Sequence, residues 1–236
     1  MNKKLLDVVI LAGGLAKRLH PLTKTLPKSL IPVNGEPFIA HQLRLLKNQG
    51  IERVVICTGF LGEMIQNYVK KGEAFQLHVT YSHEGEKLLG TAGAIKKALS
   101  LLDDKFFVLY GDSYLPCDYS AAQAAFIQSQ KKALMTVFCN EGQWDKSNVE
   151  FRDGEIFSYE KINFSERMQY IDYGLGIFYK ELFFKIPDNI PYDLADLYQA
   201  VLAEKQLAAF EIHQRFYEIG SFTGISELEQ YFLCNS

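Results

Sequence analysis

The sequence has few cysteines, no paired metal-binding spacing and no long hydrophobic run. Its four cysteines occur singly, without a Cys-x-x-Cys pair, so neither a disulfide framework nor a cysteine-based zinc site is indicated. Its five histidines lack a His-x-x-x-His spacing, which also argues against zinc. No stretch approaches the roughly 18 apolar residues that a membrane span requires. These absences predict a cytoplasmic protein with reduced thiols and no membrane partner.

The sequence also lacks a strong excess of charge of either sign. The formal net charge is -3 over 236 residues, whereas nucleic-acid-binding proteins usually show a basic excess or stripe. With 48% hydrophobic and 22% charged residues, the chain is long enough for a sizeable core and short enough for one domain. No repeat or linker divides it, so we expect a single domain over 1–236. The short apolar run at 8–12 ends in two glycines and is typical of a first strand rather than a signal peptide.

Strand-like and helix-like segments alternate in the first half of the chain. Short apolar runs rich in β-branched and aromatic residues predict strands buried on both faces, at 8–11, 54–57, 106–110 and 135–139. Helical spacing of apolar residues lies between them, at 39–46, 64–69 and 92–102. The alternation predicts an α/β fold, Rossmann-like, with a mixed, mostly parallel sheet and helices on both faces.

The second half changes character. The segments 148–151 and 155–159 flank Asp153 and Gly154, a strong hairpin signal that predicts an antiparallel extension of the sheet. Apolar residues at helical spacing predict a helix over 194–202 that begins after a capping aspartate, Asp193. A terminal helix is predicted over 225–232 by the same spacing.

A basic, glycine-led segment follows the first predicted strand. Residues 11–33 read LAGGLAKRLHPLTKTLPKSLIPV, with an arginine and three lysines among three prolines. Because Gly13 and Gly14 lack Cβ atoms, their N–H groups can approach phosphate oxygens, and Arg18 and Lys28 supply positive charge. The patterns GxGxxG, GxxxxGK[ST] and GxSxG are absent, which argues against a dinucleotide-binding enzyme, a P-loop ATPase and the usual hydrolase. The segment therefore predicts a phosphate-binding loop of another kind, at the carboxyl edge of the sheet.

This segment resembles the signature of the sugar-1-phosphate nucleotidylyltransferases. That family opens with Leu-Ala-Gly-Gly, then has an arginine, Pro-Leu-Thr, and Pro-Lys-x-Leu-x-Pro-Val. The matching positions are Leu11, Ala12, Gly13, Gly14, Arg18, 21–23 and 27–33. The resemblance implies that residues 11–14 bind the nucleotide and that Arg18 and Lys28 are catalytic. Ala16 departs from the pattern, because the family usually has glycine there, and its methyl group would change how the loop closes over a triphosphate.

The family joins a sugar 1-phosphate to a nucleoside monophosphate unit taken from a nucleoside triphosphate, and releases pyrophosphate. The attacking phosphate oxygen needs no catalytic base, since a phosphomonoester's second pKa is about 6. Alignment and neutralisation of charge by cations and Mg²⁺ are what the enzyme must supply. The resemblance therefore implies a nucleoside triphosphate and a sugar 1-phosphate as partners and Mg²⁺ as the cofactor.

Two carboxylates match the family's metal ligands. Asp112 follows a predicted buried strand and Gly111, at the same edge as the glycine-led loop, and the family's Gly-Asp at this place binds Mg²⁺. Glu218 stands where a late family element usually has aspartate, so its reach is one methylene longer. A capping aspartate in a turn and a surface glutamate are the alternatives for these two residues.

For the base, Gly90 and Thr91 match the family's Gly-Thr-Ala element at the start of a helix. We explain Gly90 by close approach of a base to the backbone. Glu84 is a candidate acceptor for a base edge and suits the N1–H and amine of guanine. Related uridylyl enzymes also carry glutamate there, however, and a solvated loop glutamate is equally consistent with the sequence.

For the sugar, Glu160 and Lys161 match the family's Glu-Lys-Pro element, with Ile162 in place of proline. The resemblance implies that Glu160 accepts from sugar hydroxyls and that Lys161 holds the sugar phosphate. Such adjacent opposite charges are also common on protein surfaces. Further candidates for lining the sugar pocket are Asn148, Asp172, Tyr173 and Gly174.

The favoured function is guanylyl transfer to mannose or heptose 1-phosphate. Uridylyl or thymidylyl transfer to another sugar 1-phosphate remains open. A non-catalytic protein of the same fold, which binds a nucleotide sugar to regulate a partner, is also consistent with Ala16 and Glu218. A glycosyltransferase would carry an Asp-x-Asp motif, which the sequence lacks. The chain is too short for the left-handed helical domain of bifunctional members, so acetyl transfer is not expected. The sequence leaves open whether the protein forms a homo-oligomer.

Overall fold

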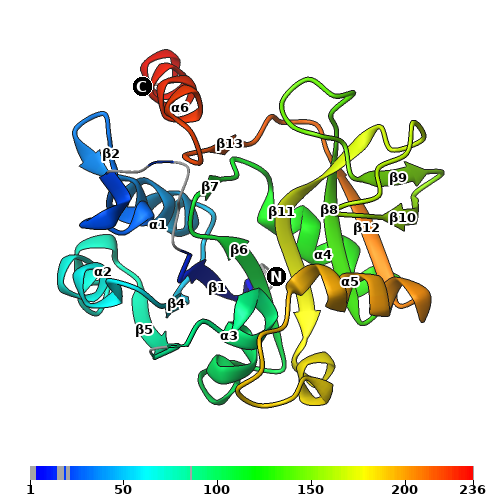
Figure 1. The fold of residues 1–236 in the computed structure, drawn as a ribbon, viewed down its shortest axis with the longest axis horizontal. Coiled ribbons are helices and arrows are strands. Elements are labelled where there is room, and N and C mark those ends of the chain that lie inside the picture. Colours follow the sequence, from blue (N-terminus) through cyan, green and yellow to red (C-terminus); the bar gives the residue numbers. More distant parts are fainter. Residues whose placement is uncertain (1–3, 15–18, 20–21, 86, 236) are drawn as a thin grey trace.

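The computed structural model of the chain describes residues 4–14, 19, 22–85 and 87–235. Among these residues, a nine-stranded mixed sheet runs through the molecule in the order β10-β9-β11-β6-β1-β4-β5, with β8 and β12 joined through β11 (Figure 1). Its strands are β1 (Asp7–Ala12), β4 (Arg53–Thr58), β5 (His78–His83), β6 (Lys105–Tyr110), β8 (Ala133–Cys139), β9 (Val149–Arg152), β10 (Glu155–Tyr159), β11 (Tyr170–Tyr179) and β12 (Leu207–Ile212).

Helices cover both faces of this sheet. The α-helices are α1 (Phe38–Asn48), α2 (Gly62–Val69), α3 (Gly90–Ala98), α4 (Tyr119–Ser129), α5 (Leu194–Ala203) and α6 (Phe222–Cys234). Short 3-10 helices are η2 (Leu22–Lys24), η3 (Lys28–Leu30), η4 (Glu73–Phe75), η5 (Leu99–Leu101) and η6 (Lys180–Lys185). The α/β fold with helices on both faces is confirmed.

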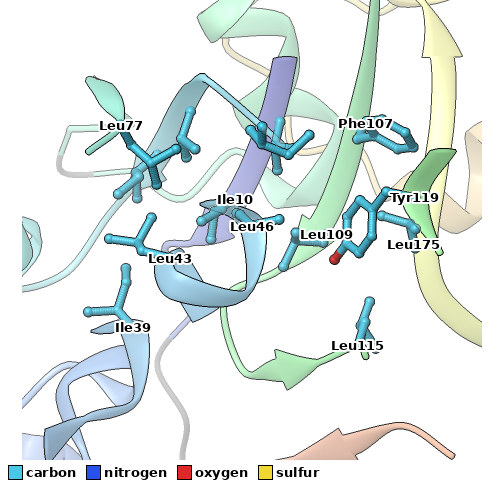
Figure 2. Close-up of a cluster of buried hydrophobic side chains, with 14 of the residues drawn as sticks. Ile10, Ile39, Leu43, Leu46, Leu77, Phe107, Leu109, Leu115, Tyr119 and Leu175 are labelled. Carbon is cyan, nitrogen blue, oxygen red and sulfur yellow. The ribbon is translucent and has the colours of Figure 1, made fainter. Parts of the chain in front are cut away.

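The parallel half of the sheet consists of β5, β4, β1 and β6. Successive residues of a strand point to opposite faces, so the central strand supplies two cores. Val8 and Ile10 pack on the side of α1, α2 and α4, whereas Val9 packs on the side of α3 and α5. Figure 2 shows the first of these cores, in which Ile10 lies among Leu43 and Leu46 of α1. Full burial on both faces explains why the sequence of β1 is apolar without alternation.

The antiparallel half begins at β11, which runs against β6 on one side and β8 on the other. The hairpin of β9 and β10 extends this half, and its two turn residues, Asp153 and Gly154, have φ angles of 52° and 81°. Positive φ at both positions is the conformation that an Asp-Gly hairpin turn adopts. The predicted antiparallel extension is therefore confirmed.

The last helix returns the chain to the first half. Figure 1 shows α6 beside the small β2 and β3 hairpin, away from β9 and β10. The hairpin pairs β2 (Pro32–Val33) with β3 (Glu36–Pro37), and a second small sheet pairs β7 (Ser113–Tyr114) with β13 (Tyr217–Glu218). Leu228 of α6 is buried with Val33 and Ile219, so α6 fixes the position of β13.

The predicted elements and the observed ones agree where the pattern is strong. The four predicted strands and the helices at 39–46, 64–69, 194–202 and 225–232 are all present. The helix predicted over 92–102 ends as α-helix at Ala98 and continues as η5 to Leu101. Asp193 caps α5 as predicted, with its side chain accepting from the N–H of Ala195. Among the described residues, no helix combines the length and the apolar character needed to cross a bilayer.

Candidate active site

Three segments converge at the carboxyl ends of β1 and β6. The N–H of Gly111 donates to the carbonyl of Leu11 over 2.9 Å, which holds the ends of the two strands together. The Ser29 hydroxyl donates to the carbonyl of Gly111 over 3.0 Å, so η3 is tied to the same point. Lys28, the first residue of η3, then places its ammonium 2.5 Å from Oδ2 of Asp112. The structure thus brings the predicted cation and the predicted metal carboxylate together.

Glu218 joins this pair through the small sheet of β7 and β13. It lies opposite Ser113 in the register, and the N–H of Ile219 donates to the carbonyl of Asp112 over 2.9 Å. A Cβ atom on Gly220 would lie 3.1 Å from Oε1 of Glu218 and 3.3 Å from Nζ of Lys28. Residues 28, 112 and 218, far apart in sequence, therefore gather at one place.

The donor set at this point fits Mg²⁺. Within the described residues no group of three or more His, Cys, Asp and Glu side chains is arranged to hold a metal ion. Two carboxylates, Asp112 and Glu218, are what the site offers. Mg²⁺ is usually held by one or two carboxylates together with substrate phosphates rather than by an all-protein cage. The pair therefore suits a metal that binds with a phosphate ligand.

A cavity of about 350 Å³ opens beside Lys28 and Asp112. All the residues predicted to bind the nucleotide line it: Leu11, Ala12, Gly13, Gly14, Glu84, Gly90 and Thr91. Its remaining lining is mostly apolar or backbone and includes Leu88, Ala94 and Gly111. We call it the nucleotide cavity, after the role that the sequence analysis predicts for these residues.

The Glu84 side chain explains why position 13 is glycine. A Cβ atom on Gly13 would lie only 2.2 Å from Oε1 of Glu84, so the missing side chain leaves room for the carboxylate. The other oxygen, Oε2, accepts from the N–H of Leu89 over 2.7 Å. Burial raises the pKa of Glu84, while the Leu89 N–H and Lys97 act in the opposite direction. The carboxylate is thus fixed at the wall of the nucleotide cavity.

Gly90 and Thr91 have structural partners that the sequence did not reveal. Gly90 has a φ of +71°, and a Cβ atom there would lie 2.7 Å from the carbonyl oxygen of Tyr192. Both this backbone conformation and this neighbour require glycine. Close approach of a base, which the sequence analysis proposed, is therefore not needed to explain Gly90. The Thr91 hydroxyl donates to Oδ1 of Asp193 over 3.1 Å and accepts from the N–H of Leu194 over 2.7 Å.

A second cavity, of about 560 Å³, shares Lys28, Tyr110 and Asp112 with the first. We call it the sugar cavity, after the role that the sequence analysis predicts for several of its residues. Among the predicted sugar-binding residues, Asn148, Lys161 and Gly174 line it, as do Asp172 and Tyr173. Its lining also includes residues that the sequence analysis missed: Asp145, Tyr159 and Phe216. No motif marks these three, because each belongs to a different segment and only the fold brings them together.

The structure places Glu160 elsewhere. Its carboxylate accepts from Nε2 of Gln199 over 3.3 Å, and it lines a separate hollow between β10 and α5 rather than the sugar cavity. Strand β10 ends at Tyr159, and beyond it Lys161 lines the sugar cavity whereas Glu160 lines the separate hollow. The prediction that the two residues act side by side on the sugar therefore does not match the geometry.

Asp172 is an acidic residue of the sugar cavity that forms hydrogen bonds with several segments. Its Oδ1 accepts from the N–H of Gly174 over 3.0 Å, its Oδ2 from the Tyr159 hydroxyl over 3.4 Å, and its own N–H donates to Asn148 over 2.9 Å. Burial raises the pKa of Asp172 to about 6, against the opposing effects of the Gly174 N–H and the Lys161 charge. A carboxylate held by several partners in a cavity is a good acceptor for ligand hydroxyls.

Arg18, predicted to be catalytic, lies outside the described residues, and so does Ala16. Their roles stay predictions. Gly14 and Lys28, which are described and stand on either side of Arg18 in the sequence, both line the nucleotide cavity.

Comparisons with known proteins agree on one family. The sequence model of the family described as Nucleotidyl transferase matches residues 7–228. The chain is 31% identical over 179 residues to a D-glycero-alpha-D-manno-heptose 1-phosphate guanylyltransferase of Campylobacter jejuni, covering 75% of this chain and 78% of that protein. It is 28% identical over 229 residues to a UTP--glucose-1-phosphate uridylyltransferase of Synechocystis, covering 89% of this chain but 58% of that protein.

A solved structure has the same fold along nearly the whole chain. HddC from Yersinia pseudotuberculosis, complexed with GMP-PN, superposes with a TM-score of 0.79 at 26% identity. The superposition covers 97% of this chain and all of that one. The similarity therefore includes both the parallel half with the nucleotide cavity and the antiparallel half with the sugar cavity.

Proposed function

The chain belongs to the nucleotidyl transferase family, and on this premise we propose that it transfers a nucleoside monophosphate unit to a sugar 1-phosphate. The observation that supports the proposal most is that the nucleotide and sugar cavities meet at Lys28 and Asp112. A reaction between two phosphorylated substrates needs such a shared boundary, because the attacking oxygen and the phosphorus must lie within about 3–3.5 Å of each other.

The proposed reaction balances without a protein base. An oxygen of the sugar phosphate attacks the α-phosphorus of the nucleoside triphosphate, and a new P–O bond forms. The bond from the α-phosphorus to the oxygen bridging the α- and β-phosphates breaks, and pyrophosphate leaves with that electron pair. Lys28 lies at the boundary where this negative charge moves, so its ammonium stabilises the transition state and Arg18 is proposed to assist. When held by Asp112 and Glu218, Mg²⁺ supplies further positive charge at the phosphate oxygens.

The favoured nucleotide is GTP and the favoured sugars are mannose and heptose 1-phosphate. Glu84 supports guanine, because its fixed carboxylate lines the nucleotide cavity and can accept from the N1–H and exocyclic amine. The guanylyltransferase relative and the GMP-PN complex of HddC point in the same direction. The Synechocystis relative acts on UTP and glucose 1-phosphate by its name, so uridylyl transfer is the second candidate.

Pyrophosphate release is the experiment that tests the proposal. The purified protein is incubated with Mg²⁺, each of GTP, UTP, dTTP, CTP and ATP, and each of mannose, heptose, glucose and N-acetylmuramate 1-phosphates. We expect release that requires both substrates and is fastest for GTP with mannose or heptose 1-phosphate. Fastest release with UTP would mean that the preferred base is uracil and not guanine. Tight binding of a nucleotide sugar without release from any pair would contradict the enzyme proposal and indicate a regulatory binding protein.

A further inference from the structure

One carboxylate oxygen connects the two cavities. Oδ1 of Asp193 accepts from Nζ of Lys161 over 2.9 Å and from the Thr91 hydroxyl over 3.1 Å. Lys161 lines the sugar cavity and Thr91 lines the nucleotide cavity. Asp193 itself lines neither. Its side chain therefore contacts one lining residue of each cavity without lining either cavity itself.

A structural role for Asp193 at the start of α5 leaves its contact with Lys161 unexplained. Asp193 is the N-cap of α5, and capping requires the hydrogen bond from the Ala195 N–H, which is 3.0 Å long. Thr91 also supports the start of α5, because its hydroxyl accepts from the N–H of Leu194 over 2.7 Å. The bond from Lys161 comes from another segment and adds nothing to the cap. Burial alone would raise the pKa of Asp193, but the Ala195 N–H and Lys161 outweigh burial, so the pKa is lowered. Asp193 is thus a charged partner for Lys161 at neutral pH.

Lys161 needs an anchor if it is to bind a phosphate in a defined position. Its side chain is 44% exposed, and a long exposed side chain samples many rotamers, which costs entropy when it is fixed. An ammonium group has three donors, so one bond to Asp193 leaves two for phosphate oxygens. Asp193 is therefore suited to hold the ammonium in place without using up its capacity.

We propose that Asp193 is a positioning residue that fixes Lys161 for the phosphate of the sugar 1-phosphate and links that position to Thr91 in the nucleotide cavity. This inference rests on the proposed function. Asp193, at the start of α5, thus contacts one residue of each cavity.

Asp193→Asn separates positioning from capping. Asparagine caps a helix about as well as aspartate, but it carries no charge to hold Lys161. Asp118→Asn is the matched control, because Asp118 caps α4 in the same way, through the Ala121 N–H, and lines neither cavity. Steady-state rates are measured with the fastest pair of the substrate panel, expected to be GTP and mannose 1-phosphate. Melting temperatures of both variants are measured alongside.

For Asp193→Asn we expect the KM for the sugar 1-phosphate to rise about tenfold. The kcat should stay within about twofold of wild type, and the melting temperature within about 2 °C. Asp118→Asn is expected to match wild type. In a Lys161→Met background, Asp193→Asn should change that KM no further, because its effect passes through Lys161. Calorimetric binding of mannose 1-phosphate to each variant gives a readout that does not depend on turnover.

The inference and the proposed function fail in different ways. Absence of pyrophosphate release from the wild type with every pair would contradict the proposed function. An active wild type with an unchanged KM in Asp193→Asn would overturn the positioning role while leaving the function intact. A loss of the same size in the Lys161→Met background, or one matched by a fall in melting temperature, would also overturn it, since either result means that Asp193 does not act through Lys161.

Discussion

The two cavities that meet at Lys28 are built in different ways. The nucleotide cavity lies in the parallel half, at the ends of β1 and β6, and its wall consists largely of glycines, backbone and apolar side chains. The sugar cavity lies in the antiparallel half and is lined by charged and polar side chains, among them Asp145, Lys161 and Asp172. These side chains come from the loop before β9, the loop after β10, and β11, and the boundary with the nucleotide cavity is formed by Lys28, Tyr110 and Asp112.

The difference shows how one fold can keep its chemistry and vary its acceptor. A backbone-lined cavity depends on strand ends and close approach, so most substitutions there disturb the fold. The loop residues that line the sugar cavity, such as Asp145 and Lys161, can change one by one without moving the sheet. We therefore expect variants of the shared boundary to affect turnover most, those of the nucleotide cavity to affect stability, and those of the sugar cavity to affect individual substrates.

Lys28→Ala is expected to have the largest effect, because it removes the cation common to both cavities. Loss of one preorganised group that stabilises transition-state charge lowers kcat by about 10²–10³-fold. Pyrophosphate release measures it, and the circular dichroism spectrum should stay as in wild type. Lys24→Ala, an exposed lysine of the same basic segment, is the control and should retain activity. Near-normal turnover of Lys28→Ala would contradict the proposal that Lys28 stabilises the transition state at the boundary of the two cavities.

Gly90→Ala tests the dependence of the nucleotide cavity on backbone. Its positive φ and the Tyr192 carbonyl 2.7 Å from the new Cβ predict a loss of about 3 kcal/mol in the free energy of unfolding, measured in urea. Gly14→Ala, in the same cavity, is the control, since a Cβ there would meet nothing within 4 Å. We expect it to unfold like wild type but to raise the KM for the triphosphate. Equal stability of Gly90→Ala and Gly14→Ala would contradict the claim that the nucleotide cavity depends on the backbone conformation of Gly90.

Asp172→Asn tests the sugar cavity by pH. The pKa of Asp172 is raised to about 6, so between about pH 4 and 6 the folded protein retains a proton that the unfolded chain has released. The free energy of unfolding therefore falls as pH rises through this window, and burial of the charge costs stability at neutral pH. Asparagine removes that cost, so the variant should be about 2 kcal/mol more stable at pH 7.5 and similar to wild type near pH 4.

Denaturant unfolding at both pH values measures this difference. Asp145→Asn, an exposed aspartate of the same cavity, is the control and should unfold like wild type at both. A stability gain for Asp172→Asn that is the same at pH 4 and pH 7.5 would mean that charge burial is not its cause.

Glu218→Gln is expected to have the smallest effect, on the metal alone. An amide oxygen is a weaker ligand than a carboxylate, so the Mg²⁺ concentration for half-maximal release should rise by about tenfold. Glu155→Gln, at the exposed hairpin turn, is the control and should leave the requirement unchanged. An unchanged requirement in Glu218→Gln would leave Asp112 as the metal carboxylate of this site on its own.

The sequence predicts the nucleotide cavity better than the sugar cavity, because several of its lining residues are contiguous in the sequence. Residues 11–14 form a contiguous motif at the end of a strongly apolar strand, so their place at the sheet edge follows from the parallel order. Strands β5, β11 and β12 and helix α4 escaped prediction. In α4, alanines occur on all sides, so its apolar residues do not mark one face.

The sugar cavity depends on long-range geometry that no local pattern contains. Tyr159 and Phe216 line one cavity only because β11 lies beside β9 and β13 returns to β7. The position of Glu160 shows the same limit, since a two-residue motif does not tell which of its two side chains faces the cavity. Glu218 was found through its resemblance to a family element, and its nearness to Lys28 is a result of folding alone.

A crystal structure with a bound nucleotide sugar, GDP-mannose, tests the central claim most directly. We predict the guanine against Glu84 and Thr91, the mannose against Asn148 and Asp172, and the two phosphates between them at Lys28. The same compound seated wholly in one cavity, or with its phosphates away from Lys28, would contradict the account of two substrates reacting at a shared boundary.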